Sequence, residues 1–173
     1  MELYYNDQWN EWVSSGASLS DLTTLLLYSY GVSNENITGG WQLIKYSGSG
    51  YSPSLTYNSN YMRFTQSDRS GGTNVSRMVS VNKIDLTDYD TLIIKHKTNT
   101  KASETYGWNN IQILSDITNN TSVEVKSLAL SENSSNIVTN SLDISTLTGS
   151  YYIAFKAWWA YSDIYEISLN YSL

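Results

Sequence analysis

A row of aromatic and amide side chains on one predicted strand is the clearest candidate for chemistry in this sequence. Residues 108–115 alternate polar residues with two isoleucines. Because side chains of a strand point alternately to its two faces, Trp108, Asn110 and Gln112 share the face opposite the isoleucines. A flat indole can stack on the C–H face of a sugar ring, while amides exchange hydrogen bonds with its hydroxyl groups. The row therefore predicts a carbohydrate-binding surface.

Similar outward groupings of an aromatic ring with a polar or charged neighbour recur elsewhere in the chain. They comprise Tyr61 with Arg63, and Tyr152 with Lys156 and Trp158, while Tyr161 lies in the adjacent turn. Two interpretations of these rings remain open. In the first, they contact a sugar. In the second, they pack under loops, under a helical insertion or against a neighbouring subunit, and contact with a subunit is the best supported of these three.

The residues that usually carry catalysis are scarce. His96 is the single histidine and falls on the apolar side of a predicted strand, so we expect it to be packed. No serine lies in a nucleophile elbow, and there is no cysteine. A metal site built from Cys and His ligands is excluded on this composition. We expect the protein not to be an enzyme and to need no cofactor.

Three aspartates lie close together in one turn. Asp85, Asp88 and Asp90 could supply oxygen ligands for a structural Ca²⁺ ion. Their spacing is not that of a regular calcium loop, so we favour turn capping, with calcium as the alternative.

Alternation of apolar and polar residues dominates the rest of the chain. In the last third, residues 151–159 and 165–173 each alternate, which predicts two half-buried strands that must face a second sheet. Counting similar segments gives about eight or nine strands, spaced as in an all-β sandwich. The stretch 132–140 reads as a polar loop. We expect one domain spanning residues 1–173, because no linker or change of composition divides it.

The segment 7–31 differs in pattern from the remainder of the sequence. Three leucines between residues 22 and 26 have helical spacing, a serine can cap their N-terminal side, and Gly31 can end the helix. We therefore predict one short helical insertion near the N-terminus. Trp9 and Trp12 within it are candidates for contact with a partner.

One pattern occurs twice. Residues 84–89 (IDLTDY) and 142–147 (LDISTL) share the order apolar, Asp, apolar, hydroxyl, and each precedes a strand ending in Lys. We expect the apolar pair to close one end of the core, while Asp and the hydroxyl satisfy backbone N–H groups where the chain crosses between sheets. Two such crossings favour a jelly roll.

Charge and hydropathy exclude several partners. A net charge of −6 disfavours binding to nucleic acid or to an anionic membrane surface. No apolar run approaches the roughly 20 residues that span a bilayer. The start MELYYNDQW has neither a basic nor an apolar region of the kind found in signal peptides. We expect the protein to act on a virion or outside a cell.

Four short motifs carry a family resemblance. They are Leu3-Tyr4, Thr38-Gly39-Gly40-Trp41, Ile84 to Leu92 and Leu147 to Ile153. In this order they resemble β-sandwich domains in tail and appendage proteins of phages of Gram-positive bacteria. More broadly, the paired Asp motifs resemble galactose-binding-like jelly rolls, which include many carbohydrate-binding modules. The resemblance covers nearly the whole chain except residues 7–31, and it implies a jelly-roll fold and a place at the exposed end of a virion protein.

These observations together predict an antiparallel jelly-roll β-sandwich that binds a bacterial surface carbohydrate without catalysis. The alternative is a structural virion protein, such as a capsid decoration, head-fibre or tail component. Its aromatic surface would then contact other virion proteins or copies of itself in a homo-oligomer. A glycan-active enzyme ranks last.

Overall fold

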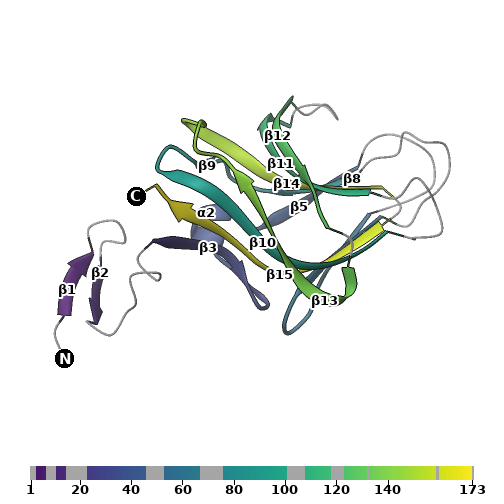
Figure 1. Cartoon of the computed structure of the whole chain (residues 1–173), viewed down its shortest axis with the longest axis horizontal. Coiled ribbons are helices and arrows are strands. Elements are labelled where there is room, and N and C mark those ends of the chain that lie inside the picture. Colours follow the sequence, from purple (N-terminus) through teal and green to yellow (C-terminus); the bar gives the residue numbers. More distant parts are fainter. Residues whose placement is uncertain are drawn as a thin grey trace.

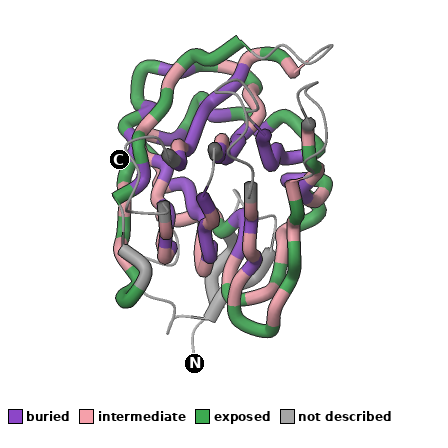
Figure 2. The backbone as a smooth tube through the Cα atoms, turned by 90° about the vertical axis from the view of Figure 1, so that its right-hand side faces the viewer, coloured by how far each residue is buried: buried purple, intermediate pink, exposed green. Residues whose placement is uncertain are grey.

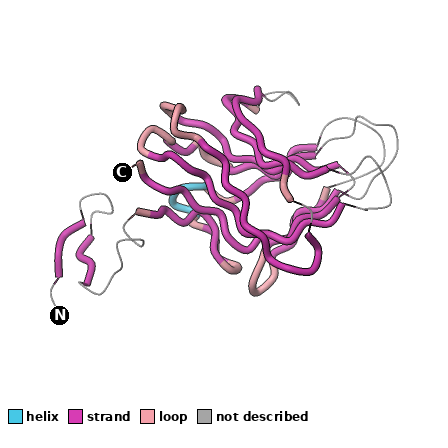
Figure 3. The backbone as a smooth tube through the Cα atoms, viewed as in Figure 1, coloured by secondary structure: helices cyan, strands magenta, loops and turns pink. Residues whose placement is uncertain are grey.

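The computed structural model describes residues 3–6, 11–14, 23–45, 53–66, 76–100, 108–117, 123–131, 133–158 and 160–172. Two antiparallel sheets face each other across a shared core (Figure 1). Strands make up most of these residues, with a single short helix, α2 (Glu35–Thr38), among them (Figure 3). The predicted all-β sandwich is thus confirmed.

The larger sheet, here named the β10 sheet, has seven strands within the described residues. Its order is β13 (Asn133–Asp143), β10 (Tyr89–Thr100), β15 (Ala160–Tyr171), β3 (Thr24–Ser29) and β4 (Val32–Ser33). The hairpin of β6 (Ser54–Tyr57) and β7 (Met62–Gln66) joins through pairing of β7 with β15. Strand β15 therefore connects the N-terminal strands with the middle of the chain.

The second sheet, here named the β14 sheet, has six strands within the described residues. Its order is β12 (Val123–Ala129), β11 (Trp108–Asp116), β14 (Ser150–Trp158), β8 (Ser76–Ser80) and β5 (Trp41–Lys45), with β9 (Ile84–Asp85) paired to β14. Strands β1 (Leu3–Asn6) and β2 (Glu11–Ser14) pair with each other.

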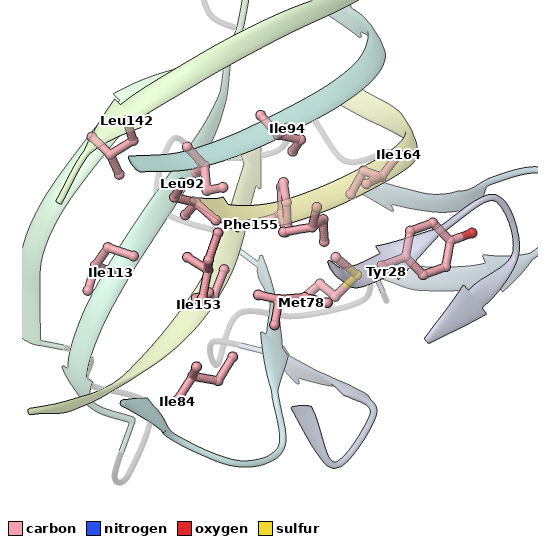
Figure 4. Close-up of a cluster of buried hydrophobic side chains, with 14 of the residues drawn as sticks. Tyr28, Met78, Ile84, Leu92, Ile94, Ile113, Leu142, Ile153, Phe155 and Ile164 are labelled. Carbon is pink, nitrogen blue, oxygen red and sulfur yellow. The ribbon is translucent and has the colours of Figure 1, made fainter. Parts of the chain in front are cut away.

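Alternate residues of both sheets point inward and form one core. Leu92, Ile94 and Ile164 enter it from the β10 sheet, and Ile153 and Phe155 enter it from the β14 sheet (Figure 4). All five side chains are buried. Figure 2 shows the buried positions concentrated between the two sheets, as the hydrophobic effect requires.

The repeated Asp motif forms the two crossings between sheets, as expected. At the first, Asp85 Oδ1 accepts hydrogen bonds from the backbone N–H and hydroxyl of Thr87, at 3.0 and 2.6 Å. At the second, Asp143 Oδ1 accepts the same pair from Ser145, at 2.9 and 2.7 Å. The apolar positions of both motifs are buried in the core.

The two crossings also bond to each other. Gly149 N–H donates to the Thr87 hydroxyl at 2.9 Å, and Leu86 N–H donates to the Gly149 carbonyl at 2.9 Å. Because the first motif leads from the β14 sheet to the β10 sheet and the second leads back, these bonds join the sheets at one end.

The helix predicted near residues 22–30 is wrong. Residues 24–29 instead form strand β3, which pairs with β15 so that Leu25 lies opposite Leu169. A register shift between Ile167 and Ser168 makes the consecutive residues Leu27 and Tyr28 both buried. The bulge interrupts the alternation that would have indicated a strand, and pairing along β15 outweighs the local helical spacing of the leucines. The rest of segment 7–31 comprises β2, the turn before β4, and residues outside the described part.

The polar loop predicted at residues 132–140 is also wrong, because residues 133–143 form strand β13. This strand pairs with β10 at the end of the sheet order, so it is an edge strand. Polar residues such as Asn136 and Thr139 are exposed there. Edge strands commonly carry polar residues, which hides the apolar alternation that reveals a central strand.

No helix among the described residues is long and apolar enough to cross a membrane.

Candidate functional site

The structure divides the predicted sugar-contacting residues between the two sheets. Trp108, Asn110, Gln112 and Trp158 belong to β11 and β14. Tyr61, Arg63 and Tyr161 lie at or on β7 and β15. We name the outer side of the β14 sheet around Arg77, Asn110, Gln112 and Lys156 the amide face. We name the outer side of the β10 sheet around Tyr30, Tyr61, Arg63, Tyr161 and Tyr165 the tyrosine face.

Strand register brings the first group together on the amide face. Trp108 and Trp158 are directly opposed in the pairing of β11 with β14, although their side chains lie outside the described part. Two residues further along β11, Asn110 is opposite Lys156, which is in turn opposite Arg77 on β8. The paired strands thus set a row of hydrogen-bonding side chains beside the two tryptophan positions.

A chain of hydrogen bonds fixes the polar groups of the amide face. Arg77 Nε donates to Gln112 Oε1 at 2.7 Å. The amide nitrogen of Gln112 donates to Glu124, whose other carboxylate oxygen accepts from the Ser127 hydroxyl at 2.8 Å. Gln112 is only 1% exposed and Arg77 8%, although both lie on the outer side of the sheet. These side chains are held in place before any ligand arrives.

The floor of the amide face is apolar. Val79, Leu114 and Ala154 form a small cluster, separate from the main core, and all are fully buried. Tyr152 packs against this cluster, and its ring lies 5.4 Å from the Lys83 ammonium. Because the three cluster residues are fully buried, the accessible apolar surface here belongs to the partly buried side chains that pack on them, such as Tyr152. Polar groups around an apolar floor suit a molecule with both hydroxyl groups and apolar C–H faces.

Lys156 adds a charge to the amide face. Burial lowers the pKa of Lys156, the nearby charge of Arg77 lowers it further, and Glu124 opposes this by raising it. The three side chains therefore influence one another electrostatically. With the amides they offer both donors and an acceptor, which is what recognition of hydroxyl groups needs.

Tyr61 and Arg63, which were predicted as a pair, lie together on the tyrosine face. Tyr161, which was predicted in the turn beside Trp158, lies on β15 and joins them instead. Arg63 Nε and Nη2 donate to the two carboxylate oxygens of Asp163 at 2.5 and 2.7 Å. This ion pair holds the pKa of Arg63 above its usual range. The guanidinium carbon lies 5.6 Å from the Tyr61 ring and 4.7 Å from the Tyr161 ring. Asn99 Nδ2 donates to the Tyr161 hydroxyl at 3.2 Å.

The remaining candidates have clear positions or lie outside the described part. Asp85 caps its turn, in agreement with the turn-capping interpretation. Among the described residues, no group of His, Asp and Glu side chains is arranged to hold a metal ion. Trp9 lies outside the described residues, and Trp12 is placed in β2 by its backbone alone.

His96 is packed, as predicted, but it is also hydrogen-bonded at both ring nitrogens. Its Nδ1 lies 2.7 Å from the Thr98 hydroxyl and its Nε2 lies 2.8 Å from Asn140 Oδ1. Asn140 Oδ1 can only accept, so Nε2 donates and Nδ1 accepts from Thr98. Burial lowers the pKa of His96, so its neutral form is favoured.

Sequence reasoning missed Arg77 and Glu124 on the amide face and Tyr165 on the tyrosine face. The strand around Arg77 was predicted, but a face could be assigned to it only through its pairing with β14. Tyr165 lies at a register shift between β10 and β15, where simple alternation fails. To assign these residues to a face, one must know which distant strands pair with each other, and the sequence pattern alone does not show this.

No protein-family model and no curated protein sequence matches the chain. Several solved structures do match over most of its length. A family 11 carbohydrate-binding module from Clostridium thermocellum, in complex with a β-1,3-1,4-mixed-linked tetrasaccharide, has a TM-score of 0.58 and 12% identity, covering 87% of this chain and 97% of the module. A family 29 module from Piromyces equi has a TM-score of 0.52 and 13% identity, covering 87% and 91%.

A different kind of domain matches equally well. The K2 cleaved adhesin domain of Lys-gingipain has a TM-score of 0.55 and 13% identity, covering 86% of this chain and 98% of the domain. Identities this low establish similarity of fold and nothing about ligands. The chain has the β-sandwich fold of carbohydrate-binding modules.

Proposed function

We propose that this chain is a non-catalytic carbohydrate-binding domain and that its amide face contacts the sugar. The observation that carries the proposal is the row of hydrogen-bonded side chains on that face, which is arranged before any ligand binds. Arg77 and Gln112 are buried on the outer side of a sheet and joined by a 2.7 Å hydrogen bond. Side chains fixed in this way lose little conformational entropy when they bind a ligand.

The arrangement suits a saccharide for two reasons. Tyr152, which is partly buried and packs on the apolar cluster of Val79, Leu114 and Ala154, can stack on the C–H face of a sugar ring. Beside it, Asn110 and Lys156 are opposed across β11 and β14 and can reach hydroxyl groups at the ring edge. The directly opposed tryptophan positions 108 and 158 would add stacking surface next to this row.

Similarity to other proteins supports the class of ligand and suggests a setting. The family 11 module of similar fold holds a mixed-linkage β-glucan fragment. The sequence motifs that resemble phage appendage domains suggest that this domain belongs to a virion and that its ligand is a bacterial surface polysaccharide.

Binding to immobilised bacterial surface polysaccharides and to mixed-linkage β-glucan tests the proposal. Trp108→Ala and Asn110→Ala should each weaken binding about tenfold, because tenfold corresponds to about 1.4 kcal/mol, within the range for an aromatic or polar hot spot. Val123→Ala is the matched control. It lies on β12 of the same sheet with 56% of its surface exposed, so its truncation should leave binding unchanged.

The contrary result is equally specific. If wild-type protein binds none of these polysaccharides while light scattering shows a stable homo-oligomer, the aromatic surface is a subunit contact. If binding occurs but both amide-face variants match the Val123 control, the sugar is held elsewhere on the molecule.

A further inference from the structure

A continuous row of rings crosses the tyrosine face, on the sheet opposite the amide face. The rings of Tyr30 and Tyr165 meet edge-on with centroids 6.2 Å apart. Tyr165 and Tyr61 follow at 5.4 Å, and the Arg63 guanidinium lies over Tyr61 at 5.6 Å and over Tyr161 at 4.7 Å. The row draws on β7, β15 and the β3–β4 turn, so folding assembles it from distant parts of the chain.

Tyr30 occupies its place in the row at a conformational cost. Its φ is 41°, the only positive φ at a non-glycine among the described residues, and 49% of its surface is exposed. For a bulky residue this left-handed conformation is a genuine outlier, where Asn or Gly would be usual. The exposed ring does not stabilise the core in return. Strain of this kind is concentrated at binding and switch sites.

Charges on this face are unevenly paired. Arg63 is bound to Asp163, and Lys95 lies 3.0 Å from Glu166. Among the described residues, no carboxylate lies within 4.0 Å of the third cation, Lys97. Its ammonium instead lies 6.0 Å from the Tyr165 ring at the centre of the row. The face therefore keeps a positive charge in a chain whose net charge is −6.

The hairpin that carries Tyr30 also forms a pocket of about 350 Å³. It is lined by Leu26, Tyr28, Ser29, Val32, Ser33 and Asn34. The buried Ser33 hydroxyl has no hydrogen-bond partner among the described residues. Because Ser33 is directly opposite Tyr28, whose ring belongs to the core, this hydroxyl lies on the inner side of the β10 sheet, and the pocket is not part of the tyrosine face.

We propose that the tyrosine face is a second ligand surface, which binds an anionic saccharide chain. The rings of Tyr30, Tyr165 and Tyr61 stack on successive sugar units, and Lys97 pairs with a carboxylate or phosphate group. Stacking surfaces and a cation without a carboxylate partner select a saccharide that is both apolar on its ring faces and negatively charged. This site is distinct from the proposed amide-face site and does not depend on it.

Affinity for two anionic probes and one neutral probe tests the assignment. Polygalacturonate supplies carboxylates, poly(glycerol phosphate) supplies phosphates, and mixed-linkage β-glucan supplies neither. We expect binding to at least one anionic probe, weakening between about 50 and about 500 mM salt as surface ion pairs are screened. Lys97→Gln should weaken it about threefold, the size expected for an exposed ion pair.

Tyr30→Asn separates binding from folding. Asn tolerates the left-handed conformation, so the variant should be at least as stable as wild type while its affinity for the anionic probe falls about two- to tenfold. Lys95→Gln is the matched control, since it is on the same strand and face but already paired with Glu166. It should change affinity less than Lys97→Gln does.

The proposal is overturned if neither anionic probe binds, or if Lys97→Gln and Tyr30→Asn leave anionic binding unchanged. Trp108→Ala should not affect anionic binding, whatever it does to the neutral glucan. Loss of both kinds of binding in Trp108→Ala would place all ligands on the amide face and refute a second surface.

Discussion

The contact between two hairpins that supports the tyrosine face depends on a single glycine. Gly31 follows Tyr30 in the β3–β4 turn with φ of 96°, and a Cβ built on it would lie 2.7 Å from the carbonyl oxygen of Ser59. That oxygen belongs to the turn between β6 and β7, which leads into Tyr61. Gly31→Ala should therefore both strain the turn and push the two hairpins apart.

The structure offers a reference for separating these two effects. Gly40 has a similar φ of 87°, but nothing lies within 4 Å of a Cβ at that position. Gly40→Ala should cost only the left-handed backbone term, about 1–2 kcal/mol. Gly31→Ala should add an overpacking cost of about 1–3 kcal/mol, because the opposing atom is backbone and cannot rotate away. Loss of unfolded-state entropy favours both variants alike and cancels in the comparison.

Equilibrium unfolding in urea, followed by intrinsic fluorescence, measures both changes. We expect Gly31→Ala to lower the free energy of unfolding by at least about 1 kcal/mol more than Gly40→Ala, or about 2–4 °C in melting temperature for a chain of this size. Equal losses, or a larger loss for Gly40→Ala, would show that the hairpins do not touch as described. Weaker anionic binding in Gly31→Ala would further connect this contact with the tyrosine row.

Three further predictions concern the crossings, the buried histidine and the ion pair. Leu86 and Ile144 occupy equivalent buried positions of the two crossings. Leu86→Ala and Ile144→Ala should each lower the free energy of unfolding, measured in denaturant, by about 2–5 kcal/mol. A loss below about 1 kcal/mol for either variant would contradict the motif's role in the core. Burial lowers the pKa of His96 below its ordinary 6.5, so the unfolded chain takes up a proton before the folded chain does as the pH falls. The stability of the fold should therefore decline below about pH 6.5. In the His96→Gln variant, the melting temperature should depend less on pH between about 7 and about 5 than it does in wild type. Arg63→Ala should lower the free energy of unfolding by about 1–3 kcal/mol, which is more than Asp163→Asn should. The reason is that Arg63→Ala leaves an Asp163 side chain that is only 9% exposed without its partner, whereas the 40% exposed Arg63 can be hydrated when Asp163 is replaced. The reverse order of stability in thermal melts would refute this account.

The fold was predictable where local pattern and tertiary role coincide. The repeated motif at Asp85 and Asp143 needs only a carboxylate and a hydroxyl two residues later, so its hydrogen bonds could be anticipated from spacing. The inward positions of β11 likewise follow from strict alternation, as the burial of Ile111 and Ile113 confirms. In such segments the partner strand does not alter which side chains point inward.

Prediction failed where the partner strand decides the outcome. Strand β3 does not alternate cleanly because its pairing with β15 includes a bulge at Leu27, and β13 is polar because it is an edge strand. Prediction of the candidate site failed for a related reason. Alternation assigns Trp108 and Tyr61 each to the outer side of a strand, but nothing local shows that β7 and β11 belong to different sheets.

The hydrogen-bonded crossings explain how one small sandwich can present two independent surfaces. Bonds between Thr87, Leu86 and Gly149 join the sheets at one end, so the register of β10 and β14 depends on buried and turn residues. Side chains of the outer rows, such as Lys97 and Lys156, are absent from that joint and from the main core. Substitutions there should leave the packing between the sheets intact. For this reason the amide face and the tyrosine face can be altered separately, and an effect that spreads from one to the other would indicate that a substitution had disturbed the core.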